Sequence, residues 1–193
     1  PNLDRLAARG VVFDQCFASP VAEPLLQDAA WSLSERLRGQ CVRVRWLSET
    51  DDSADSDTDD LSQTSFAKLV TQAADALAEL SLDTFTPWLL WLESRGIGWP
   101  GLATPQFAEL YADELAEEVP AELVAIREIE VAYAALVTQF DHLLGGLLGM
   151  IDRLFGDAPP VIVVVAAHGQ GVCEAEMLSP FADRSAELTA DAG

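Results

Sequence analysis

One segment, from Pro120 to Val165, constrains the fold of this chain more than any other. Apolar residues recur at helical spacing between Pro120 and Phe155 and predict one helix of unusual length. The apolar stripe of this helix consists of Ile126, Ile129, Tyr133, Leu136, Phe140, Leu143, Leu147, Ile151 and Leu154. The sequence Asp157-Ala158-Pro159-Pro160 ends it, because proline cannot continue a helix. The β-branched run Val161–Val165 then predicts the clearest strand in the sequence.

Helices and strands are predicted to alternate before the long helix. Asn2 can cap a helix over Leu3–Arg9, and Gly10 can end that helix in the usual C′ role. The apolar stretch Val11–Phe17 then predicts a strand.

A second helix and strand follow. Ser32 and Glu35 form a capping box that opens a helix, which closes near Gly39. The alternating pattern of Cys41–Leu47 predicts a strand flanked by cationic side chains.

Two further helices and a strand complete the pattern. Asp60 and Gln63 can cap a helix, whose apolar positions are Phe66, Leu69, Val70, Ala73, Leu77 and Leu80. The apolar run Pro87–Leu92 is typical of a strand buried on both faces, and Thr104-Pro105 begins a short helix. Together these elements predict an α/β fold, with a mostly parallel sheet flanked by helices in a single domain over residues 1–193.

Composition excludes several classes of partner. Lysine and arginine number 11 against 32 aspartates and glutamates, a net charge of −21. Such a chain is repelled by nucleic acids and by anionic membrane surfaces. The longest uninterrupted apolar run, Val161–Ala167, is too short to span a bilayer. We therefore expect no nucleic-acid partner and no membrane span.

Cysteines and acidic residues give no metal motif. Cys16, Cys41 and Cys173 form no CxxC pair, and their odd number leaves one thiol unpaired under any disulfide scheme. The acidic run Glu49–Asp60 lacks the glycine and the terminal glutamate of an EF-hand loop. This run is therefore predicted to be a solvated, flexible loop, with weak cation binding as the alternative.

Three segments carry a likeness to known enzymes. Pro1–Phe13 reads PNLDRLAARGVVF and Val161–Gly171 reads VIVVVAAHGQG. Between them, Tyr133–Phe155 contains Phe140-Asp141 followed by Leu143-Leu144-Gly145. In chain order they resemble the opening motif, the long helix and the strand-and-turn of the sulfatase family, within the alkaline-phosphatase-like superfamily. The resemblance implies an alkaline-phosphatase-like sheet that is incomplete at its N-terminus, because the family's first strand and first metal carboxylates precede the motif found at Pro1.

The same resemblance implies a catalytic apparatus that this sequence lacks. Sulfatases use a cysteine matured to formylglycine, in a C-x-P-x-R motif, to attack a sulfate ester. The matching segment places Ala22 at the cysteine position and Leu26 at the arginine position, with only Pro24 retained. Alanine cannot become a nucleophile and leucine cannot pair with a sulfate.

The metal and substrate positions implied by the family are also altered. The family's metal-binding aspartate is Ala167 here, while His168 remains as a candidate metal contact. Gly98 stands where a substrate-contacting histidine is implied. No cofactor is expected from these residues, although the family resemblance implies calcium.

Other reactive residues have ordinary explanations. Cys16 is predicted to be a small core residue, because the sequence around it has no C-x-P-x-R form. Ser19 is predicted to lie in a turn and has no evident base near it. Asp141 and His142 are adjacent on one helix and point about 100° apart, so they do not face one site.

Three hypotheses follow. The first is a sulfatase-like domain without hydrolase activity, retained as a binding or structural module for a protein partner or a sulfated ligand. The second is an active, metal-dependent hydrolase of sulfate or phosphate esters that uses an altered site containing His168. The third is an interaction protein whose acidic loop and helices form the partner surface. Substrate, compartment and oligomeric state are left open by the sequence.

Overall fold

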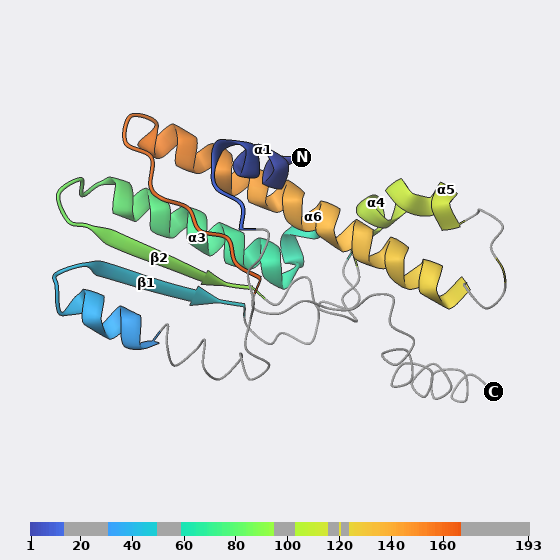
Figure 1. Cartoon of the computed structure of the whole chain (residues 1–193), viewed down its shortest axis with the longest axis horizontal. Helices are drawn as coiled ribbons and strands as arrows, with labels where there is room; N and C mark the ends of the chain where they lie inside the picture. The colour runs from blue at the N-terminus through green and yellow to red at the C-terminus, as the bar shows by residue number, and fades with distance from the viewer. Residues whose placement is uncertain (14–30, 50–58, 95–102, 116–119, 121–123, 167–193) are drawn as a thin grey trace.

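The computed structural model describes residues 1–13, 31–49, 59–94, 103–115, 120 and 124–166 (Figure 1). In chain order the elements are α1 (Asn2–Arg9), β1 (Arg43–Ser48), the 3₁₀ helix η2 (Leu61–Gln63), α3 (Ser65–Ser81), β2 (Trp88–Glu93), α4 (Pro105–Ala108), the 3₁₀ helix η3 (Glu109–Tyr111), α5 (Ala112–Leu115) and α6 (Val124–Phe155). A further helix spans residues 31–38. The predicted α/β class is confirmed at this general level.

The sheet consists of β1 and β2, which pair in parallel with Arg43 opposite Trp88 and Ser48 opposite Glu93. Helix α3 connects the two strands, as the crossover of a parallel pair requires. The cationic side chains of β1 point toward α3. There Arg43 pairs with Asp83 at 2.9 Å and Arg45 pairs with Glu79 at 2.6 Å.

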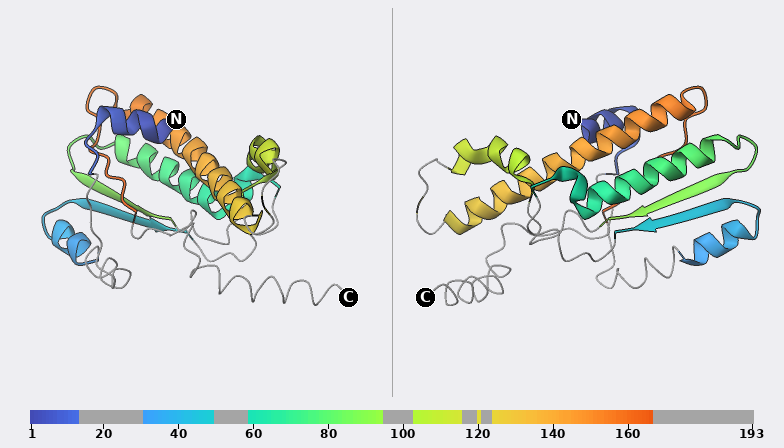
Figure 2. Two further views of the ribbon diagram at one scale, coloured as in Figure 1. Left: turned by 45° about the vertical axis from the view of Figure 1, so that its right-hand side comes forward. Right: turned by 180° about the vertical axis from the view of Figure 1, so that it is seen from behind.

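The hydrophobic core lies between the sheet, α3 and α6. Its centre is made of Ala73 and Leu77 from α3 together with Leu147 and Ile151 from α6. Leu47, Trp88 and Leu90 from the sheet pack against this centre, as do Val70, Leu148 and Phe155. Figure 2 shows from two further directions that α3 lies between the sheet and the long diagonal of α6. The predicted apolar stripes of both helices therefore meet each other.

The helix ends differ from the predictions in how they are capped. Asn2 is the first residue of α1, and the preceding Pro1 makes no side-chain cap. The predicted end of α1 before Gly10 is confirmed, but Gly10 is extended, with φ −126° and ψ −157°, and does not take the left-handed conformation usual at C′. Helix α3 is capped by the Thr64 hydroxyl, which accepts from the Ala67 N–H, whereas Asp60 caps η2.

The predicted capping box is also not formed as expected. Ser32 lies inside helix 31–38, not before it. Glu35 pairs with Arg38 at 3.0 Å, one turn along the same helix. The predicted end of this helix near Gly39 is confirmed.

Two of the four predicted strands are confirmed. β1 and β2 lie within two residues of their predicted bounds, although β2 is half-buried rather than covered on both faces. Residues 11–13, the described part of the predicted strand Val11–Phe17, are not in a strand. Val161–Val165 is not in a strand either. Both segments are largely exposed, and neither pairs with a strand among the described residues.

Helix α6, and not the apolar run Val161–Ala167, is the segment that bears on the expectation of no membrane span. Its segment Ile126–Phe155 is long and apolar enough to cross a membrane by length and composition alone. The same test also selects core helices of water-soluble proteins, so it is weak evidence. In this fold α6 packs against α3 and buries two polar side chains, Gln139 and Asp141, that are bonded to other segments.

Candidate functional site

The residues named from the sequence for catalysis, metal or substrate binding lie outside the described ranges: Ala22, Leu26, Gly98, Ala167 and His168. Cys16, Ser19 and most of the acidic run 49–60 also lie outside them. Their positions relative to one another are therefore not described.

Metal-binding chemistry is not assembled in the described part of the chain. There, no group of three or more histidine, cysteine, aspartate or glutamate side chains could hold a metal ion. At the metal position implied by the sulfatase resemblance, Ala167 carries no side-chain oxygen with which to coordinate calcium. The residues at that position do not fit the implied ion, and no chemical step is derived through it.

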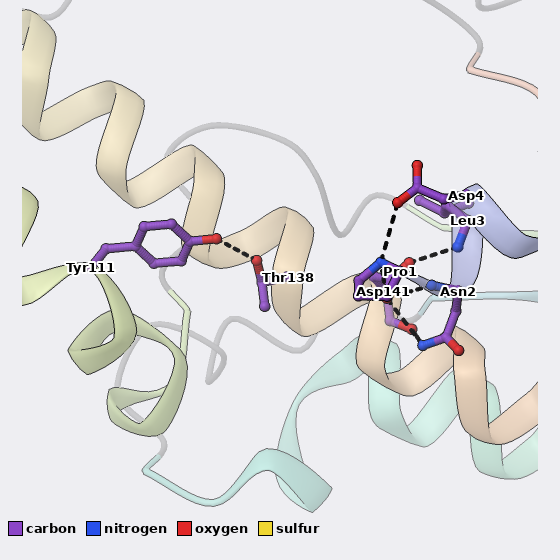
Figure 3. Close-up of polar contacts among 7 residues, drawn as sticks. All are labelled: Pro1, Asn2, Leu3, Asp4, Tyr111, Thr138 and Asp141. Atoms are coloured by element: carbon purple, nitrogen blue, oxygen red, sulfur yellow. Dashed lines mark hydrogen bonds and ion pairs between the residues drawn. The ribbon is translucent and has the colours of Figure 1, made fainter.

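The most connected polar cluster surrounds Asp141, in the middle of α6 (Figure 3). The Oδ1 atom of Asp141 accepts the backbone N–H of Leu3 at 2.7 Å, and its Oδ2 atom accepts the backbone N–H of Asn2 at 3.0 Å. The amino group of Pro1 lies 3.2 Å from Oδ2. The carboxylate thus accepts hydrogen bonds from backbone N–H groups at the start of α1, which have no acceptor inside that helix.

The side chain of Asn2 completes this joint. Its amide nitrogen donates to the backbone carbonyl of Asp141 and to Oδ2, each at 3.0 Å. The sequence predicted that Asn2 caps its own helix. Its side chain instead bonds to α6. Asp141 acts as the cap in its place, and its negative charge lies at the positive end of the α1 dipole.

A glycine makes the close approach of the two helices possible. Gly145 lies one turn after Asp141 on α6, and a Cβ atom at this position would overlap the side-chain amide of Asn2. By contrast, the neighbouring Gly146 and the nearby Gly149 have open space where a Cβ atom would stand. Among these three glycines, only Gly145 is required by packing.

The charge state of Asp141 follows from its contacts. Its side chain is only 7% exposed, and this burial raises the pKa of the carboxyl. The hydrogen bonds from the backbone of Asn2 and Leu3, from the chain's amino terminus and from the Asn2 side chain lower it. The net result is a pKa below the ordinary value, so Asp141 is ionised and engaged at neutral pH.

This pKa predicts a pH dependence of stability with a definite sign. A carboxyl whose pKa is lower in the folded state stabilises the fold above its unfolded pKa, here 3.8, and loses that contribution as the pH falls through the folded value. We expect the difference in free energy of unfolding between the wild type and Asp141→Asn to be constant near neutral pH and to shrink below about pH 4. Denaturant unfolding of both proteins at a series of pH values measures it. A difference that grows on acidification would contradict this account.

A second polar joint holds α4 and η3 to α6. The side-chain carbonyl of Gln139 accepts the backbone N–H of Thr104 at 2.8 Å and its hydroxyl at 3.0 Å. The hydroxyls of Tyr111 and Thr138 are 2.6 Å apart (Figure 3). Helix α6 is thus the scaffold to which both α1 and the α4–η3 segment are bonded.

Asp141 and His142 do not share a site, which confirms the interpretation of their spacing. Asp141 is buried beneath α1, whereas His142 is exposed and its ring lies 5.5 Å from that of Phe107. Sequence reasoning nevertheless missed what Asp141 does. The available signal was a carboxylate beside the apolar stripe of a helix, which requires hydrogen-bond donors when it is buried.

The chemistry available to this cluster is structural. A carboxylate that already accepts several N–H groups, and whose pKa is lowered, is a poor proton acceptor for a bound substrate.

Comparison with protein-family models, with curated proteins and with solved structures finds no match for the chain.

Proposed function

We propose that this chain is a sulfatase-like domain that has lost hydrolase activity and serves as a binding or structural module. The observation that carries the proposal is the combination of a family-like framework with Ala22, Leu26 and Ala167 at the three positions where the chemistry would reside. A lost nucleophile, a lost sulfate partner and a lost metal ligand remove different parts of one mechanism.

The contacts around Asp141 support the framework part of this proposal. Two of the segments that resemble the sulfatase family, Pro1–Phe13 and Tyr133–Phe155, lie far apart in the sequence. They are bonded through Asn2, Leu3 and Asp141. These bonds give both motifs a structural role in joining α1 to α6, and that role does not depend on catalysis.

The net charge favours one of the two ligand classes suggested by the sequence. With a charge of −21 the domain repels a sulfated ligand, and no arginine stands at Leu26 to offset that repulsion. A protein partner is therefore the better fit for the retained role.

The test is hydrolysis of an aryl sulfate and an aryl phosphate by the full chain, together with calorimetry of calcium binding. We expect no turnover above the rate without protein and no calcium heat. The alternative, an active metal-dependent hydrolase, predicts turnover that His168→Ala abolishes. The chain has only 2 histidines, so His142→Ala, at an exposed position on α6, is the matched control and should leave such turnover intact. That pattern of results would refute the proposal.

A further inference from the structure

We draw no further inference here: the strongest candidate, the surface patch at the turn between α3 and β2 where the side chains of Leu82 and Phe85 are exposed, carries no proposal, because nothing in the structure shows what covers it.

Discussion

Asp141→Ala should lower the free energy of unfolding by about 3 kcal/mol, one of the two largest effects we expect from a single substitution. The substitution removes the acceptor of the Asn2 and Leu3 backbone N–H groups and leaves these donors without a partner in a partly buried position. It also removes the negative charge at the start of α1. Denaturant unfolding measures the global change, and hydrogen exchange at the amides of α1 should show local opening.

Asp152→Ala is the matched control, on the same helix about three turns later. Its carboxylate lies 3.8 Å from Arg9, at the other end of α1, and its side chain is 54% exposed. An exposed pair of this kind contributes little, so we expect a change within about 0.5 kcal/mol. Similar effects of the two substitutions would mean that α1 is held by general electrostatics and not by the cap that Asp141 provides.

The elements that sequence reasoning predicted well are those whose formation depends on local pattern. Helix α3 has its apolar residues at helical spacing, and Leu69, Ala73, Leu77 and Leu80 are buried as that spacing requires. Helix α6 ends at Phe155, just before the sequence that contains Pro159 and Pro160. In both cases the information lies within a few turns of chain.

The strands were predicted less well, because a strand needs a partner. The sequences of β1 and Val161–Val165 both favour extended backbone, but only β1 has a neighbour in the described structure. A run of valines predicts that a strand is favourable if an edge is available. It carries no information on whether that edge is present.

The polar joint at Asp141 could not be predicted from spacing, because its partners are 138 and 139 residues away. Local reasoning gave the correct negative result that Asp141 and His142 point apart. What Asp141 contacts depends on how α1 crosses α6, a property of the packed core. Ala22, Leu26 and Ala167, which the proposed sulfatase resemblance sets at the family's reactive positions, lie outside the described residues.

The two adjacent glycines of α6 should respond to the same substitution with opposite signs. Replacing a helical glycine by alanine normally stabilises a helix by about 1 kcal/mol, because alanine loses less backbone entropy on folding. Gly146→Ala should show this gain, since nothing lies within 4 Å of the added Cβ atom. Gly149→Ala should behave in the same way.

Gly145→Ala should instead destabilise the fold by about 2 kcal/mol, in spite of the same helix-propensity gain. The added methyl group occupies the position of the Asn2 side-chain amide, which must leave the carbonyl and the carboxylate of Asp141. A double variant, Asn2→Ala with Gly145→Ala, separates overlap from helix propensity. Without the Asn2 amide the clash is absent, so Gly145→Ala should then become neutral or stabilising in the Asn2→Ala background. If Gly145→Ala stabilises the wild-type chain as much as Gly146→Ala does, α1 does not pack against α6 at this position. The contact of the Asn2 side chain with α6 would then have to be abandoned.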